Sequence, residues 1–171
     1  YLAYANNRIG IDVPETELVT NRLLEINDHD IFMQENPSLG YSFYDVHNDN
    51  SGVYYSSRKR PIIDFQPKFI AKLGGKDSNV WQFNADTHIL GWFNHFKQNY
   101  DVITDHDLQK YGLSIIKKYK AIVTGTHPEY YSLKMLNTLQ SYINKGGRLM
   151  YLGGNGFYWR ISFDKNDNSI I

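Results

Sequence analysis

A histidine and a glutamate stand two residues apart in the middle of the chain, at His127 and Glu129. They lie in a polar loop between a short β-branched apolar run, residues 121–124, and a helical pattern that begins at Ser132. In α/β proteins the loop after a strand commonly carries the chemistry. There a histidine can transfer a proton, and a carboxylate can bind a metal ion. The alternative interpretation is a rigid turn at Pro128, with Glu129 stabilised by the positive end of the following helix.

Other predicted strands also end in polar residues. The strand ends supply Tyr4, Asn6, Thr104, Asp105 and Asn155. Because ligands bind outside the carboxyl ends of parallel strands, we expect these groups to meet the loop histidine and glutamate at one edge of the sheet. A long irregular segment, residues 41–67, can cover this edge. It would add the side chains of Tyr44, Asp45, His47 and Asp49.

Some of these features have simpler explanations. The spacing of Asp45 and His47 suits a chelating pair, yet short clusters of Asp, His and Asn are also ordinary in turns. The stretch Gly153-Gly-Asn-Gly156 resembles an anion-binding loop, but no amphipathic helix clearly follows it, so a plain strand exit is favoured. The tryptophans are predicted to lie in the core; they are Trp81, Trp92 and Trp159.

The candidate residues offer phenols, a carboxylate, an amide and a histidine, a set that suits a hard, Lewis-acidic cation. The chain contains no cysteine, which excludes thiolate metal sites, a cysteine nucleophile and disulfides. It also lacks a Gly-x-Ser-x-Gly motif, a Walker loop and a His-Glu-x-x-His helix. A conventional Ser-His-Asp triad is therefore unsupported.

Length and charge narrow the class of protein further. A chain of 171 residues, 42% hydrophobic and 21% charged, is typical of a single globular domain over residues 1–171. Eighteen basic residues balance eighteen acidic ones, so neither nucleic acid nor a membrane surface is an expected partner. No apolar run approaches the roughly 20 residues of a membrane helix, and we expect a cytoplasmic location. Because the chain begins with Tyr1 rather than Met, we expect a fragment of a longer polypeptide.

Strands and amphipathic helices alternate in the second half of the chain. The patterns predict strands at 100–104, 120–124 and 148–152, and helices between Asp86 and Phe96, Asp105 and Ile116, and Ser132 and Gly146. A further strand, or its last turns, is expected at 1–5, and a weaker helical pattern covers 17–26. This alternation predicts an α/β domain with a mostly parallel sheet covered on both faces, plus the long irregular loop.

Six groups of segments carry a resemblance to a known family. They are Tyr1-Leu-Ala-Tyr-Ala-Asn6, Tyr44-Asp-Val-His-Asn-Asp49, Tyr55-Ser-Ser-Arg58 with Arg60-Pro61, Trp81-Gln-Phe-Asn-Ala-Asp-Thr-His88, Thr126-His-Pro-Glu-Tyr-Tyr-Ser132, and Gly146-Gly-Arg-Leu-Met-Tyr-Leu-Gly-Gly-Asn-Gly-Phe-Tyr-Trp159. Together they resemble the large (beta) subunit of the bacterial N,N-dimethylformamidase family. The resemblance implies that family's catalytic domain, a three-layer Rossmann-like or flavodoxin-like fold of the class I glutamine amidotransferase type. It also implies a small partner subunit and homo-oligomers in the full-length protein.

The resemblance further implies a mononuclear ferric iron site. By motif, the ligands are the phenolates of Tyr4 and Tyr44 and the carboxylate of Glu129, with Tyr1 as the alternative to Tyr4. His127 and Asn155 are then expected beside the ligands or against the substrate. The implied activity is hydrolysis of the C–N bond of small formamides, such as N,N-dimethylformamide, to formate and dimethylamine. The alternative is a non-catalytic domain of the same fold that binds a small ligand or sugar, or serves as a scaffold.

Overall fold

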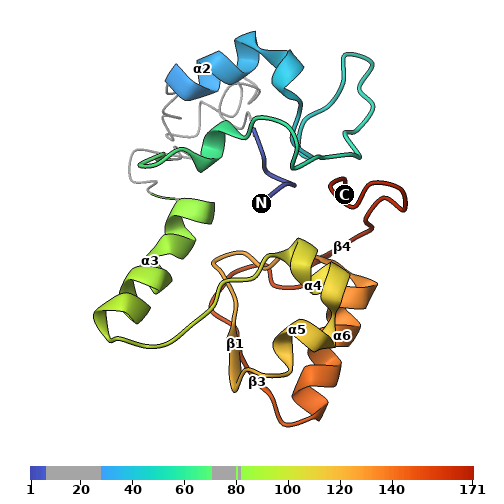
Figure 1. Cartoon of the computed structure of the whole chain (residues 1–171). Helices are drawn as coiled ribbons and strands as arrows, with labels where there is room; N and C mark the ends of the chain where they lie inside the picture. Colours follow the sequence, from blue (N-terminus) through green and yellow to red (C-terminus); the bar gives the residue numbers. More distant parts are fainter. Residues whose placement is uncertain (7–27, 71–79, 81) are drawn as a thin grey trace. The chain divides into compact units, whose positions relative to one another are not determined.

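Two compact units make up the chain, one of residues 1–85 with Ile170 and the other of residues 86–169 with Ile171. The computed structural model in Figure 1 describes residues 1–6, 28–70, 80 and 82–171. The helical pattern predicted over 17–26 and the core position predicted for Trp81 lie outside these residues. The interpretation of residues 1–171 as a single domain stays a prediction.

A hydrogen-bonded turn begins the first unit, so the strand predicted at 1–5 is wrong. The N–H groups of Tyr4 and Ala5 donate to the carbonyls three residues earlier, at 3.1 and 3.3 Å. Asn6 ends the turn in a left-handed conformation, with φ 59° and a fully buried side chain. Its amide donates to the carbonyl oxygens of Leu39 and Pro61 at 3.2 and 2.9 Å. The apolar residues of this stretch are therefore buried against loops rather than in a sheet.

The remainder of the first unit consists of short helices and an ordered loop. Its helical elements are α2 (Asp28–Glu35), η1 (Pro37–Leu39), η2 (Ile63–Phe65) and the first residues of α3 (Gln82–His95). The irregular segment predicted at 41–67 is confirmed apart from η2. Arg60 fixes this segment to the N-terminal turn, because its guanidinium donates to the Ala5 carbonyl at 3.2 Å and to the Ser56 hydroxyl at 3.0 Å.

Two pairs of parallel strands form the sheets of the second unit. β1 (Ala121–Val123) pairs with β3 (Arg148–Met150), and β2 (Tyr130–Ser132) pairs with β4 (Trp159–Ile161). The strands predicted at 120–124 and 148–152 are confirmed, whereas β2 and β4 were not predicted. The parallel direction agrees with the expected α/β pattern, and the three-layer, flavodoxin-like class stays a prediction.

The helices α4 (Asp105–Tyr111), α5 (Leu113–Ile116) and α6 (Leu133–Asn144) accompany these strands (Figure 1). They bury the apolar core, which consists of Leu108, Ile116, Tyr131, Met135, Leu139 and Tyr142. The strand predicted at 100–104 is wrong, because Thr104 instead caps α4 in a reciprocal capping box with Asp107. The helix predicted from Asp105 is interrupted at Gly112, whose φ is 56°.

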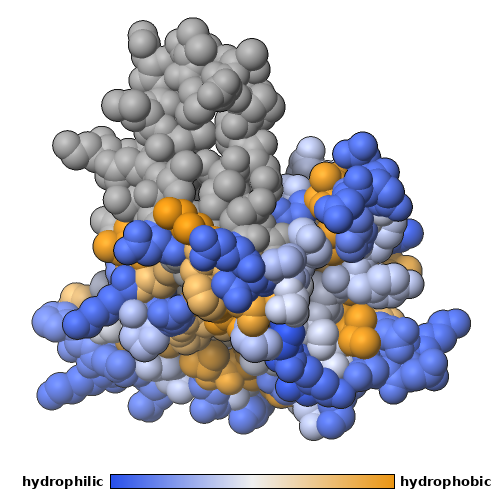
Figure 2. All heavy atoms as spheres, turned by 90° about the horizontal axis from the view of Figure 1, so that it is seen from above, coloured by the Kyte–Doolittle hydropathy of each residue, from blue (hydrophilic) through white to orange (hydrophobic). Residues whose placement is uncertain are grey.

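The surface of the described residues is mixed in polarity. Hydrophilic side chains surround smaller hydrophobic areas on the face seen in Figure 2. Trp92 and Trp159 are 51% and 53% exposed, so their predicted core positions are wrong. Tryptophan is large and amphipathic, and its occurrence alone does not fix its burial. None of the described helices has the length and apolar composition needed to cross a membrane.

The helix α6 has well-defined signals at both ends. The Ser132 hydroxyl accepts the N–H of Met135 at 3.1 Å, which satisfies one of the free donors of the first turn. Met135, Leu139 and Tyr142 then turn one face of the helix into the core. Gly146 follows the helix with φ 87°, where a residue without a side chain costs least. These local signals explain why the sequence predicted this helix correctly.

Loss of the cap at Ser132 should destabilise the second unit. We expect Ser132→Ala to lower the free energy of unfolding by about 1 kcal/mol, because the Met135 N–H loses its acceptor. The matched control is Ser141→Ala on the exposed side of the same helix, which should change stability by less than about 0.5 kcal/mol. Chemical denaturation followed by circular dichroism measures both, and equal losses would contradict the capping role.

Candidate active site

Two tyrosines of the first unit lie ring against ring. The rings of Tyr4 and Tyr44 are stacked, with centroids 4.7 Å apart and planes 19° apart. The Tyr44 hydroxyl donates to the Tyr4 hydroxyl at 2.9 Å. A backbone bond one residue before each tyrosine aligns them, since the Phe43 N–H donates to the Ala3 carbonyl at 2.9 Å. The structure thus brings two of the predicted phenol ligands together, although 40 residues separate them in the sequence.

Such a pair offers two oxygen donors at one point. Tyrosines ordinarily ionise near pH 10, so two adjacent phenolates at neutral pH require a nearby cation. Tyr44 is 44% exposed, which leaves its oxygen accessible. Tyr1, the alternative ligand, packs edge-on against Phe65 and Phe83 at centroid distances of 5.5 and 6.4 Å. Its ring belongs to an aromatic cluster, so the geometry favours Tyr4.

In the second unit, the loop with His127 and Glu129 is fixed by backbone hydrogen bonds to the segment 150–159. The N–H groups of Gly154, Phe157 and Trp159 donate to the carbonyls of residues 126, 128 and 129 at 2.9, 2.8 and 3.0 Å. These bonds continue the pairing of β1 with β3 towards that of β2 with β4. The Glu129 side chain is buried, with only 3% of the residue exposed. A carboxylate at this depth requires compensating donors or a cation.

The predicted partners His127 and Asn155 belong to these two facing loops. A Cβ placed on Gly154 would lie 3.3 Å from Cε1 of the His127 imidazole. Asn155 is the next residue, in a left-handed conformation with φ 49° and an exposed side chain. The sequence rule about strand ends therefore predicted this meeting of loops. The glycine-rich stretch is a strand exit, as favoured, and leads to β4 rather than to a helix.

Close backbone contact explains one of the glycines in that stretch. A Cβ on Gly153 would lie 2.4 Å from the Thr126 carbonyl oxygen and 2.6 Å from Cδ of Pro128. Real side chains do not approach so closely, so only glycine allows the two loops to pair at this point. Gly153 therefore serves the close packing of the two loops.

Four of the other polar residues expected at the site make structural contacts. Thr104 caps α4, and Asn6 holds the N-terminal turn. Asp45 accepts the Ser42 N–H at 2.7 Å, and Asp49 accepts the Ser51 hydroxyl at 2.7 Å, which are the contacts of turns. Within the described ranges, no three His, Asp or Glu side chains gather as a metal site.

Asp86 was not among the site residues predicted from the sequence. The sequence predicted a helix beginning at Asp86, but this residue lies inside α3, and its Oδ1 accepts the Thr126 N–H at 2.6 Å. Burial raises the pKa of the Asp86 carboxyl above its ordinary value, and the Thr126 N–H opposes this shift. Burial, supported by the charge of Asp105, also raises the pKa of Tyr131, which stays a neutral phenol. No spacing in the sequence links a helix residue to a loop 40 positions later.

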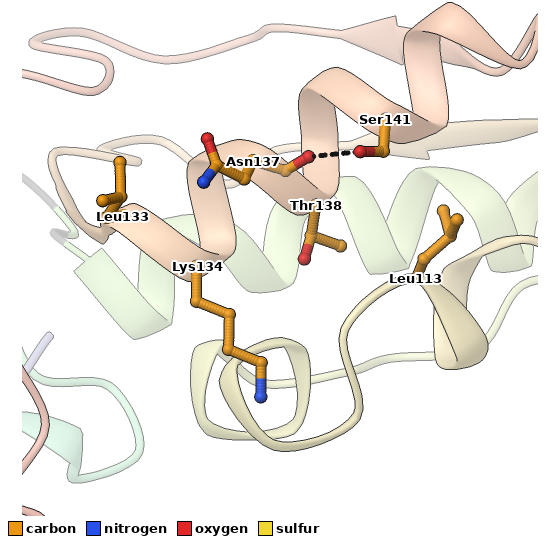
Figure 3. Close-up of a pocket in the computed structure, with 6 residues that line it drawn as sticks. All are labelled: Leu113, Leu133, Lys134, Asn137, Thr138 and Ser141. Carbon is orange, nitrogen blue, oxygen red and sulfur yellow. Dashed lines mark hydrogen bonds between the residues drawn. The ribbon is translucent and has the colours of Figure 1, made fainter.

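A surface hollow of about 540 Å³ lies elsewhere in the second unit (Figure 3). It is lined by Leu113, Leu133, Lys134, Asn137, Thr138 and Ser141. The Ser141 hydroxyl already donates to the Asn137 carbonyl at 2.7 Å. None of the predicted site residues lines this hollow.

The predicted site residues fall into two groups, the phenols in the first unit and the glutamate, histidine and asparagine in the second. Their combination in one site stays a prediction.

Residues 1–170 match the family model described as N,N-dimethylformamidase beta subunit-like, C-terminal. The N,N-dimethylformamidase beta subunit of Paracoccus aminophilus is 37% identical over 163 residues, which cover 95% of this chain and 21% of that protein. The beta subunit of the same name from an Alcaligenes species is 39% identical over 160 residues, which cover 93% of this chain and 20% of that protein. The chain therefore spans about a fifth of the length of these curated relatives.

An alanine at Gly153 should separate the two loops. We expect Gly153→Ala to lower the free energy of unfolding by about 1 to 3 kcal/mol, because its Cβ meets backbone and proline ring atoms that cannot rotate away. The matched control is Gly91→Ala in α3, where a Cβ meets nothing within 4 Å and should stabilise the helix by about 0.5 to 1 kcal/mol. Urea denaturation of both variants checks the contrast, and a neutral Gly153→Ala would contradict the close loop contact.

Proposed function

The chain belongs to the N,N-dimethylformamidase beta subunit-like, C-terminal family, and from this premise we propose that it is the catalytic segment of an amide hydrolase. Its substrates are small linear amides, N,N-dimethylformamide first among them. The observation that carries the proposal is the match over residues 1–170, which includes every candidate site residue. Hydrolysis breaks the C–N bond, adds the oxygen of water to the formyl carbon and releases formate and dimethylamine.

The metal of the proposed enzyme is a mononuclear ferric iron. Tyr4, Tyr44 and Glu129 would hold it through two phenolate oxygens and one carboxylate. The phenol oxygens, 2.9 Å apart, fit two donors to one ion, and the buried Glu129 supplies the remaining charge. Three anionic oxygens neutralise a trivalent cation and match its preference for hard ligands. When bound, such an ion polarises an amide carbonyl and lowers the pKa of a coordinated water.

The side chains of the two facing loops would handle the protons and the amide. His127 would transfer a proton to the departing amine nitrogen, since a neutral amine leaves far more readily than an amide anion. The Asn155 amide group can donate a hydrogen bond to the carbonyl oxygen as negative charge develops on it. The backbone bonds between the loops support these roles, because they hold the segments that carry both residues.

The proposed enzyme contains more than this chain. The relatives are named as beta subunits, and the chain spans about a fifth of their length. We therefore propose a small partner subunit and a homo-oligomeric assembly for the full-length protein. The cytoplasmic location stays a prediction.

Removal of one ligand oxygen should weaken metal binding and lower activity together. In the complete protein, we expect Tyr44→Phe and Glu129→Gln each to lower iron content and the rate of dimethylamine release by about 10- to 100-fold. Phenylalanine keeps the ring that stacks on Tyr4 and removes only the donor oxygen. The matched control is Tyr54→Phe, at a tyrosine of the same unit that is 75% exposed. It should keep both iron and activity.

Metal analysis and colour separate this proposal from the non-catalytic alternative. Phenolate bound to ferric iron absorbs visible light, so the native protein should be coloured and Tyr44→Phe paler. A ligand-binding or scaffold domain would contain no iron and would tolerate both substitutions. A full-length protein that purifies without iron and releases no dimethylamine would overturn the proposed function.

A further inference from the structure

The Asp86 side chain connects helix α3 to the loop that precedes the candidate catalytic residues. Its Oδ1 accepts the N–H of Thr126 at 2.6 Å, across 40 residues of sequence. Thr126 is the residue directly before His127 and three before Glu129. A short bond from a partly buried carboxyl group to a backbone N–H restrains that peptide more firmly than a solvent contact would. The helix therefore restrains the start of the loop through this one side chain.

Gly125 shows how closely the carboxyl group approaches the backbone. A Cβ at this position would lie 2.4 Å from Oδ2 of Asp86 and 2.8 Å from its Cγ. The φ of Gly125 lies outside the left-handed region, so the backbone conformation itself does not demand glycine. The carboxyl group of Asp86 occupies the space that a Cβ would need. The carboxyl group therefore covers the backbone of two consecutive residues, 125 and 126.

Thr126 is also held at its carbonyl group, which belongs to the next peptide, the one that joins it to His127. This carbonyl accepts the N–H of Gly154 at 2.9 Å. Gly154 in turn lies against the His127 imidazole and directly precedes Asn155. Thr126 therefore contacts α3 through its N–H and the facing loop through its carbonyl.

We propose that Asp86 is a positioning residue, which acts through the N–H of Thr126 to fix the loop of His127 and Glu129; this rests on the proposed function of that loop. Asp86 contacts backbone rather than substrate, so its loss should lower kcat more than it changes KM. The positioning requires an oxygen that accepts the Thr126 N–H, so the amide of an asparagine can replace the carboxyl group. Burial, which raises the pKa of Asp86, supports this view, because the site does not favour a negative charge.

Two substitutions in the complete protein distinguish the effect of the acceptor oxygen from that of the shape of the side chain. Asp86→Asn keeps an oxygen that can accept the Thr126 N–H, and we expect kcat within about threefold of the native value. Asp86→Leu keeps the same number and branching of side-chain heavy atoms but has no acceptor, and we expect kcat to fall by about 10- to 100-fold with KM within about threefold. Equal losses in both variants would overturn the proposal.

Hydrogen exchange gives a measurement that does not depend on activity. In Asp86→Leu the Thr126 amide should exchange at least about fivefold faster, while the amides inside α6 keep their native rates as the internal control. Asp86→Asn should leave the Thr126 rate near the native one. A native rate in Asp86→Leu would overturn the role of Asp86, whereas an inactive native protein would overturn only the proposed function.

Gly125→Ala tests the same contact from the loop side, as one arm of a double-mutant cycle. In the native background its Cβ displaces the carboxyl group, so we expect faster exchange of the Thr126 amide. In the Asp86→Ala background that space is open, so Gly125→Ala should add less than about twofold. Effects that multiply independently in the two backgrounds would show that the glycine and the aspartate act separately, and would overturn the proposal.

Discussion

The second unit depends on the hydrogen bonding of one backbone segment to another, residues 124–130 to 150–159. The pairing starts in β1 and β3, passes through the two loops as bonds to the carbonyls of residues 126, 128 and 129, and ends in β2 and β4. Buried backbone groups need partners, and this arrangement provides them where the chain has no regular structure. The loops are therefore as constrained as strands, which a site that must hold a histidine and a carboxylate in place requires.

This pairing dictates residue types beyond the hydrogen bonds themselves. The loops approach so closely at Gly153 that a side chain would contact the Thr126 carbonyl oxygen. Gly125 leaves room for Asp86 in the same way. Both glycines allow close packing at these positions. The strand pairing also leads directly into α6, because Ser132 is both the last residue of β2 and the cap of the helix.

Local signals in the sequence were enough for one part of the fold and the site. A β-branched run predicted β1, and a serine cap with a glycine stop predicted α6. The rule that strand ends meet at one edge predicted that the histidine and asparagine loops face each other. Apolar residues at 1–5 and 100–104 gave wrong strands, because burial under loops and a capping box at Thr104 leave the same pattern. The contacts of Tyr4 with Tyr44 and of Asp86 with Thr126 each span 40 residues, and no local pattern encodes them.

The two groups of candidate residues, the phenols and the loop with Glu129, are held in different ways. The phenols contact each other directly, because the Tyr44 hydroxyl donates to the Tyr4 hydroxyl. As metal ligands they would have to release protons, since a metal binds phenolates and not phenols. The buried Glu129 belongs to a loop whose backbone is hydrogen-bonded to the segment 150–159. In the proposed metal site, the phenols would therefore bind only after losing their protons, whereas Glu129 would bind from a loop held by its own backbone hydrogen bonds.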